Sequence, residues 1–457
     1  MARENWSSRT GFVLAAAGSA VGLGNIWKFP YLAGKFGGGA FLLAYLLLVY
    51  TIVKSIMLSE IAIGRAAAKN PVGAFAKLHN NRWKAVGFLG VLAAFMILSF
   101  YSVVAGWAIH YTGQMASGAI NGLGADKLGA VFGSFISDTV SPIIYHAIFM
   151  SIAVFVVCRG VNRGIEKLSK VMMPLLLVLV LVLIVRGLML PGSEKGLEFY
   201  LVPQWSQLGN FDLWSAALGQ AFFSLSLGMG TMLTYGSYLN KKENLPGVSM
   251  AVSFVDTGIA FLAGLLVLPA VFAFGFDNAA GPGLTFITLP AVFNQIFGGQ
   301  VFGTLFFILL TFAALTSAVS ILEVLVAYLS EEKGYSRKKS AIMAGFTTFV
   351  VGIACSYSLG PWSDITIASI FGFTADVKIF NLAVFDLLDY ISANILLPLG
   401  GLFIAVFVGW VHPVKMMKEI TNDGTLDFWW KSIFSITVKY ITPIAVGYIL
   451  LNSIGII

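Results

Sequence analysis

Charged residues are scarce in this chain: Asp, Glu, Lys and Arg make up only 11% of its 457 residues, whereas 58% are hydrophobic. Soluble globular domains carry about 25% charged residues, so this composition excludes a soluble protein of this length. Cysteine and histidine are rarer still, with two and four copies. Because the histidines lack the spacing of metal ligands, we predict no transition-metal site.

The chain also lacks the residue sets that identify membrane enzymes and ion channels. No nucleophile stands beside a general base, and no cluster of histidines and acidic residues occurs, so we predict that the protein is not an enzyme. A channel needs repeated filter elements or rings of charge, and the sequence shows neither. No glycine-rich phosphate loop is present, so no nucleotide is expected.

What the chain does contain is a series of long apolar segments, each close to the roughly 20 residues that cross a bilayer. Eleven of them can be placed, at about residues 11–36, 39–64, 86–114, 142–160, 171–192, 213–238, 249–275, 298–329, 340–357, 382–411 and 430–456. This pattern predicts an all-α polytopic membrane protein with a single transmembrane domain, 1–457. No cleaved signal peptide is predicted before the first span.

Lysines and arginines gather in alternate loops, for example within 65–84, 159–170 and 333–339. By the positive-inside rule these loops are cytoplasmic, so the N-terminus is cytoplasmic and the C-terminus lies outside. The net charge of +7 is then an insertion signal and gives no reason to expect nucleic acid. Because long termini are absent, we expect a bacterial inner membrane.

Two of the spans are interrupted by paired glycines. Gly22 and Gly24 lie in the first span, and Gly228 and Gly230 lie in the sixth, each pair beside hydroxyl or amide side chains. Glycine allows the backbone to open, and unpaired backbone groups are tolerated in a bilayer only where protein, ions or a ligand satisfy them. We therefore predict two broken helices that build one site at mid-membrane.

The residues around these breaks resemble the neurotransmitter:sodium symporter family, specifically its bacterial amino-acid transporters. The similar stretches are Gly18 to Pro30, Gly37 to Phe41, Phe222 to Tyr238 and Phe312 to Ser317. The resemblance implies a LeuT-type fold, in which five spans are repeated in inverted orientation. The repeats would be 1–192 and 213–411, with 430–456 as an additional span, whereas many relatives have a twelfth.

The same resemblance implies a sodium-coupled symporter of hydrophobic or aromatic L-amino acids that works by alternating access and carries two sodium ions per substrate. The substrate site it implies comprises Ala20, Gly22, Leu23, Gly24, Ile97, Tyr101, Phe223, Ser224, Ser226, Met229, Ser317, Ala318 and Ile321. Leu23, Gly24 and Tyr101 would hold the carboxylate. Gly22 leaves room for it, where relatives that carry monoamines have aspartate. The alternative is a symporter for a non-proteinogenic amino acid or an osmolyte.

Two sodium sites are implied in the same way. The first comprises Ala20, Asn25, Ser224 and Asp256 with the substrate carboxylate, and the second comprises Gly18, Val21, Ala313, Thr316 and Ser317. Animal relatives have asparagine at the place of Asp256 and bind chloride beside it, near Tyr45, Gln220, Ser224 and a serine that is Ala260 here. We therefore predict transport that does not depend on chloride.

Gates are expected at both ends of the site. The outer candidates are Lys28, Asp389 and Phe223, and the inner candidates are Arg3, Trp6, Ser237, Tyr238 and Glu331. Since lysine lacks the bidentate fork of the arginine that many relatives have, we expect the outer charge pair to be weak.

Four further features lie in or next to the spans. Glu60 is expected to accept hydrogen bonds from unwound backbone, with proton transfer as the alternative, and Glu323 could take part in proton countertransport. The segment from Gly164 to Pro174 is either a stretch that unwinds or an ordinary helix start. The pattern gives no reason for Lys54 in the second span.

Overall fold

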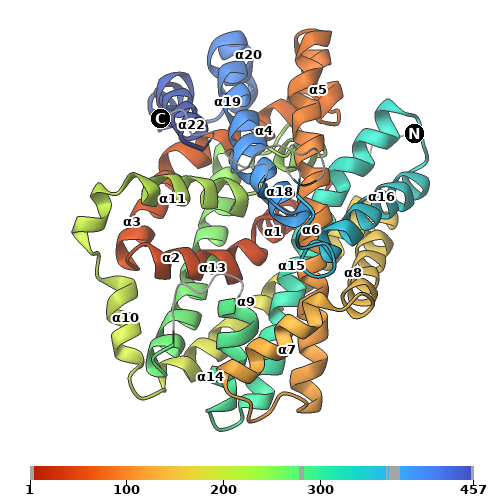
Figure 1. Cartoon of the computed structure of the whole chain (residues 1–457). Helices are drawn as coiled ribbons and strands as arrows, with labels where there is room; N and C mark the ends of the chain where they lie inside the picture. The colour runs from red at the N-terminus through yellow and green to blue at the C-terminus, as the bar shows by residue number, and fades with distance from the viewer. Residues whose placement is uncertain (1–4, 277–282, 367–368, 370–380, 454–457) are drawn as a thin grey trace.

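The structure, a computed structural model, describes residues 5–276, 283–366, 369 and 381–453 (Figure 1). Regular structure in these residues is helical, and the described part of the chain contains no β-strand. The helices of the first half are α1 (Arg9–Ala20), α2 (Phe29–Lys35), α3 (Gly39–Leu48), α4 (Lys54–Ala67), α5 (Pro71–Leu78), α6 (Lys84–Ser117), α7 (Ala125–Ser137), α8 (Ser141–Cys158), α9 (Lys167–Leu188) and α10 (Ser193–Leu201). Those of the second half are α11 (Phe211–Ser224), α12 (Thr231–Gly236), α13 (Leu245–Ala273), α14 (Leu289–Asn294), α15 (Gly299–Glu332), α16 (Arg337–Tyr357), α18 (Val384–Tyr390), α19 (Leu397–Val406), α20 (Pro413–Ile420), α21 (Lys431–Ile436) and α22 (Thr442–Ser453).

Short helical turns of other pitch join several of these helices into continuous spans. The π-helical turns are η1 (Gly24–Lys28), η2 (Val49–Val53), η4 (Val161–Glu166), η6 (Leu284–Thr288), η8 (Ile391–Leu396), η9 (Phe407–Val411) and η10 (Thr437–Ile441), and the 3₁₀ turns are η3 (Asn81–Trp83) and η5 (Trp205–Gly209). Such π-helical turns often mark functional positions in a helix.

Nine helices among the described residues are long and apolar enough to cross a membrane, and one bent pair, Arg9–Ala20 with Gly24–Lys35, brings the number to ten. These ten correspond to ten of the eleven predicted spans. The other predicted span, 213–238, is divided into α11 and α12, which are separately too short to cross a bilayer. Both predicted breaks are therefore present as interruptions of the helix.

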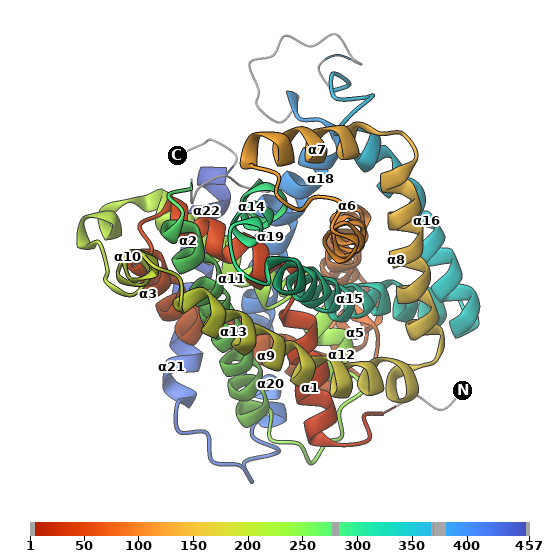
Figure 2. The same cartoon turned by 90° about the horizontal axis from the view of Figure 1, so that it is seen from below.

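The two broken segments lie in the middle of the bundle. Figures 1 and 2 both place α1, α6 and α15 centrally, with α8 and α16 together at one side and α3 and α10 at the other. α15 packs along α6, and α1 packs against both α13 and α15. This arrangement surrounds the breaks with protein, so lipid does not reach their open backbone.

The last span lies at the edge of the molecule. Lys431–Asn452 has only 28% of its apolar window buried, compared with 78% for Gly299–Glu332. Its helix α22 packs on α19, and both views show it on the side away from α8 and α16. This position fits its predicted role as an addition to the ten-helix core.

The fifth span begins earlier than predicted. The segment from Gly164 to Pro174 is helical here. The turn η4 continues directly into α9, and Pro174 lies inside α9. A Cβ on Gly164 would lie 2.1 Å from the carbonyl oxygen of Val156, so the glycine permits close contact between η4 and α8. In this conformation the segment is wound, and unwinding remains a prediction for another state.

Candidate functional site

The first break separates α1 from the segment Gly24–Lys35. The axes of these two parts of the span are inclined to each other by 50°. α1 ends at Ala20, where the backbone of Val21 turns extended. The amide of Gly22 donates to Asn25 Oδ1 over 3.2 Å, and the amide of Leu23 donates to Tyr101 Oη over 3.1 Å. Because an unpaired amide is costly inside a bilayer, these two side chains stabilise the open backbone.

The glycines of this first break serve for close contact. Neither Gly22 nor Gly24 has a positive φ. A Cβ on Gly22 would lie 2.6 Å from Tyr101 Oη, and one on Gly24 would lie 3.0 Å from the ring of Phe223. The prediction that these two glycines supply backbone freedom is therefore wrong for the first break. These two positions require the absence of a side chain.

The second break does depend on the conformational freedom of glycine. Gly228 and Gly230 have φ values of 79° and 76°, a region that residues with a Cβ rarely adopt. A Cβ on Gly228 would also lie 2.3 Å from the carbonyl oxygen of Leu397. The amide of Gly228 donates to Glu60 Oε1 over 2.7 Å. This bond confirms the prediction that Glu60 accepts from unwound backbone.

Hydrogen bonds hold the two breaks against each other. Ser226, itself left-handed with φ 54°, donates from its hydroxyl to the carbonyl oxygen of Ser19 over 3.0 Å. Gln220 Nε2 donates to the carbonyl oxygen of Gly24 over 2.7 Å. The Ser226 hydroxyl thereby satisfies the Ser19 carbonyl, and Gln220 adds a bond to the Gly24 carbonyl, which also accepts from the Phe29 amide. The two breaks therefore form one unit.

A small enclosed cavity lies where the breaks meet. Every predicted substrate residue except Leu23 and Ala318 lines it: Ala20, Gly22, Gly24, Ile97, Tyr101, Phe223, Ser224, Ser226, Met229, Ser317 and Ile321. Leu23 instead contributes its amide to Tyr101, and Ala318 is fully buried. Its lining combines backbone and hydroxyl groups of the breaks with the apolar side chains of Ile97, Met229 and Ile321.

The predicted first sodium set converges on one buried carboxylate. Asp256 Oδ1 accepts from Asn25 Nδ2 and from Ser224 Oγ, each over 2.8 Å. Asp256 Oδ2 accepts from Tyr45 Oη over 3.3 Å. A buried charge needs such partners or an ion. The set therefore provides hard oxygen atoms and one negative charge beside the cavity.

The predicted second sodium set lies where α1 meets α15. A Cβ on Gly18 would lie 3.4 Å from Thr316 Cβ, so the two helices are in direct contact at this point. Thr316 Oγ1 donates to the carbonyl oxygen of Ala313 over 3.1 Å, and Ser317 lines the cavity. Val21 follows the last residue of α1 and has extended backbone. The structure thus places these oxygen-bearing groups along one helix contact.

The predicted outer gate is assembled at the other side of the cavity. Lys28 Nζ lies 4.0 Å from Asp389 Oδ1 and 4.9 Å from the ring centroid of Phe223, which lines the cavity. The side chains of Lys28 and Asp389 are 29% and 39% exposed. Exposed ion pairs contribute about 0–1 kcal/mol, so this charge pair is a weak closure.

Replacing Asp389 by asparagine is therefore expected to change substrate uptake by less than about fivefold, which corresponds to about 1 kcal/mol. Initial rates of radiolabelled uptake into proteoliposomes measure this. Phe223→Ala, which removes the ring next to the cavity, serves as the comparison. A loss above fiftyfold in Asp389→Asn would contradict a weak outer pair.

The predicted inner gate falls partly outside the described residues, since Arg3 is among those the structure does not describe. Trp6 Nε1 donates to the carbonyl oxygen of Tyr235 over 3.0 Å, and its ring packs edge-on against Tyr235 and Tyr238. Ser237 is buried in the same region. The segment before α1 is thereby fixed to the end of α12.

Glu331, the remaining inner candidate, binds a helix cap. Its Oε2 accepts from the backbone amide of Asn70 over 2.7 Å and from Asn70 Nδ2 over 3.0 Å. Asn70 in turn caps α5, with Oδ1 accepting from the amides of Val72 and Gly73. Asn followed by Pro71 is a helix-start signal that could have indicated this cap from the sequence.

Comparison with known proteins decides the assignment. The model of the sodium:neurotransmitter symporter family matches residues 3–120 and 136–456 of this chain. The chain belongs to the sodium:neurotransmitter symporter family. It is therefore an integral membrane protein and a sodium-dependent symporter, and not an enzyme.

Other members of this family are similar over nearly the whole chain. The crystal structure of MhsT in complex with L-phenylalanine matches with a TM-score of 0.90 and 43% identity, covering 99% of this chain and 100% of MhsT, which confirms the LeuT-type fold. The sodium-dependent transporter YhdH of Bacillus subtilis is 40% identical, with 99% and 98% covered. The human sodium- and chloride-dependent GABA transporter 2 is 25% identical, with 92% and 75% covered.

One buried ion pair of this symporter was not predicted. Glu323 Oε2 accepts from Arg337 Nη2 over 2.6 Å, and Glu323 Oε1 accepts from Arg337 Nη1 over 3.0 Å and from Tyr238 Oη over 2.8 Å. Glu323 is fully buried, whereas Arg337 is 25% exposed. The pair joins α15, α16 and the end of α12. This environment favours a structural role for Glu323 over proton exchange.

Replacing Glu323 by glutamine is accordingly expected to lower the thermal unfolding temperature by several degrees. The change leaves the Arg337 cation without its carboxylate, and breaking a buried pair costs about 3–5 kcal/mol, less for a partly exposed partner. Thermal unfolding and the pH profile of uptake are both measured, with exposed Glu194→Gln as the control. A stable variant whose uptake no longer depends on pH would instead favour proton exchange.

Lys54 also receives an explanation from the tertiary structure. Its Nζ lies 3.9 Å from the ring centroid of Trp430, at the start of the last span, and its side chain is buried. A cation over an indole face is stabilised by the ring quadrupole. Lys54 therefore links α4 to the additional span, a contact between residues too distant in sequence to be predicted.

Proposed function

We propose that this protein couples two sodium ions to the uptake of one hydrophobic or aromatic L-amino acid, without chloride, by alternating access. The supporting observation is the cavity between the two breaks, whose lining combines polar groups, such as Tyr101 and Ser226, with apolar side chains. An α-amino acid needs both, because its charged groups must be paired when buried and its side chain must be desolvated.

The substrate class is supported by the residue at position 22 and by similarity. Because Gly22 has no side chain, the open backbone of the first span lies in direct contact with Tyr101 Oη and Ser317, and no aspartate stands there to meet the amine of a substrate without a carboxylate. MhsT, whose crystal structure is a complex with L-phenylalanine, is 43% identical to this chain. An apolar wall is poorly suited to a strongly polar osmolyte.

Independence from chloride is proposed from the surroundings of Asp256. The family resemblance implies that the residues matching Tyr45 and Ser224 bind the chloride ion in animal relatives. In this protein both hydroxyls donate hydrogen bonds to the Asp256 carboxylate. The Nε2 group of Gln220 donates a hydrogen bond to the carbonyl oxygen of Gly24. The donors are occupied and a fixed negative charge is already present, so a second anion would be repelled.

Two sodium ions would supply sufficient driving force. One charge crossing 100 mV gains about 2.3 kcal/mol, so two ions with a zwitterion gain about 4.6 kcal/mol. At about 1.4 kcal/mol for each tenfold ratio, the potential alone supports more than a thousandfold accumulation. We also propose a location in a bacterial inner membrane, with the cytoplasmic N-terminus that the loop charges predict.

Binding of radiolabelled tryptophan, phenylalanine and leucine to purified protein, in sodium and in potassium, tests this function. We expect saturable binding in sodium only, with the same affinity in chloride and in gluconate, and its loss in Asn25→Ala. Binding of betaine or taurine in sodium, with none of the three amino acids, would move the assignment to the osmolyte alternative.

A further inference from the structure

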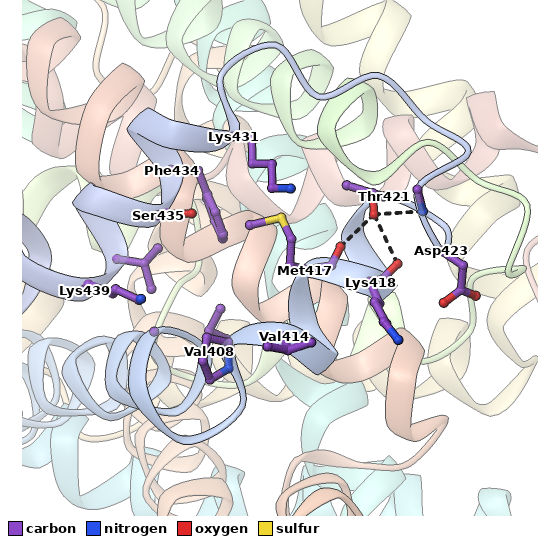
Figure 3. A pocket seen from close by; sticks show the side chains of 14 residues that line it. Val408, Val414, Met417, Lys418, Thr421, Asp423, Lys431, Phe434, Ser435 and Lys439 are labelled. Atoms are coloured by element: carbon purple, nitrogen blue, oxygen red, sulfur yellow. Dashed lines mark hydrogen bonds between the residues drawn. The ribbon is translucent and has the colours of Figure 1, made fainter.

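A second cavity, of about 540 Å³, lies far from the breaks at the start of the last span (Figure 3). It is formed by η9, α20, α21 and η10. Three lysines line it, Lys418 from α20, Lys431 from α21 and Lys439 from η10, and Figure 3 shows them around Met417. The loop charges assign this end of the molecule to the cytoplasm.

The three ammonium groups have no acidic partner. Among the described residues, none of Lys418, Lys431 and Lys439 forms a side-chain hydrogen bond or an ion pair, although Asp423 also lines the cavity. The nearby Glu419 is already bound by Arg65 and Lys241. A site with three positive charges and one negative charge therefore has an unbalanced positive field.

Lys439 lies within the membrane-spanning segment. It is eight residues beyond Lys431 in the span Lys431–Asn452, which is about 12 Å along a helix. A lysine at that depth is costly in hydrocarbon unless its charge reaches the interface or meets an anion. Its side chain is only partly exposed and opens into the cavity. An anion at the level of the lipid headgroups would therefore be a suitable partner for Lys439.

The walls of the cavity are apolar and its surroundings are interfacial. Val408 and Phe434 line it and are almost fully buried. Outside it, Trp410 is 57% exposed and Tyr440 is 52% exposed, with ring centroids 5.6 Å apart, and Trp410 Nε1 donates to the carbonyl oxygen of Lys439 over 3.0 Å. Exposed tryptophan and tyrosine mark the level of lipid headgroups.

We propose that this cavity binds the headgroup of an anionic phospholipid, such as phosphatidylglycerol. Lys431 and Lys439 contact the phosphate, Lys418 adds positive charge at the rim, and the apolar wall of Val408 and Phe434 contacts the start of an acyl chain. Basic cavities between membrane helices on the cytoplasmic side suit such headgroups. A free phosphate would satisfy the charge but would leave the apolar wall without a partner.

The test titrates purified protein in detergent with dioleoyl phosphatidylglycerol or dioleoyl phosphatidylcholine and counts bound lipid by native mass spectrometry. We expect preferential binding of phosphatidylglycerol. One lysine near an anionic surface contributes about a fivefold change in binding, so Lys431→Gln with Lys439→Gln is expected to weaken the affinity about thirtyfold.

The control pair is Lys333→Gln with Lys338→Gln, which removes the same charge from exposed lysines outside the cavity. Lys431→Arg with Lys439→Arg keeps the charge and is expected to keep binding, which guards against a folding defect in the glutamine pair. Equal weakening in the control pair, or equal binding of both lipids, would overturn the proposal. So would inorganic phosphate that displaces the lipid completely at equal ionic strength.

Discussion

Replacing Asp256 by asparagine is expected to lower the apparent sodium affinity on the order of a hundredfold in chloride-free buffer, with partial recovery when chloride is added. The substitution keeps the shape of the side chain but removes the negative charge that Asn25, Ser224 and Tyr45 now surround. Losing the charged partner of a buried cation costs about 3 kcal/mol, which is roughly a hundredfold. Chloride is expected to help because the Tyr45 and Ser224 hydroxyls become available to an anion.

The sodium dependence of tryptophan binding measures this effect in the variant and in wild type. Asp389→Asn is the matched control, since it removes the same charge from an exposed pair. Unchanged sodium dependence in Asp256→Asn would show that this carboxylate does not face the ion. A wild-type protein that requires chloride, and loses that requirement in Tyr45→Phe, would contradict the proposed independence from chloride.

Replacing Gly22 by alanine is expected to weaken amino-acid binding more than a hundredfold while the protein remains folded. The added Cβ would lie 2.6 Å from Tyr101 Oη and 2.9 Å from Ser317 Cβ, in the space proposed for the substrate carboxylate. The Tyr101 side chain can move aside, but it then loses the hydrogen bond from the Leu23 amide. Loss of both the space and a positioned donor removes the means of holding a buried carboxylate.

Equilibrium binding of leucine and thermal unfolding are measured together for this variant. Gly258→Ala is the control, because a Cβ there would meet nothing within 4 Å. Tyr101→Phe tests the same site without adding volume and is expected to weaken binding about tenfold. Normal affinity in Gly22→Ala would place the carboxylate elsewhere in the cavity.

The number and position of the membrane spans could be predicted because a bilayer accepts only helices whose backbone groups are internally bonded. Each such helix needs about 20 apolar residues, and that pattern is local in the sequence. The breaks could be predicted for a related reason. Paired glycines with hydroxyl neighbours are unfavourable in a plain span, so Gly228 and Gly230 indicated open backbone, and Glu60 was correctly expected to satisfy it.

The contacts between distant segments depended on the tertiary structure. Glu323 could be placed in a span as a candidate for proton exchange, but its pairing with Arg337 depends on how α16 folds back on α15. No neighbouring residue in the sequence explains a lysine at position 54 in the second span. Only the packing of the last span brings the ring of Trp430 over it.

The sequence by itself determined the class of protein, the two breaks and most of the residues that line the cavity where the breaks meet. It could do so because hydrophobicity and backbone chemistry act over short stretches. Only the tertiary structure decided that Gly22 and Gly24 serve close contact, whereas Gly228 and Gly230 need left-handed backbone. It also brought Lys418, Lys431 and Lys439 to one cavity. Steric contact and charge balance are properties of neighbours in space, and helix packing sets those neighbours.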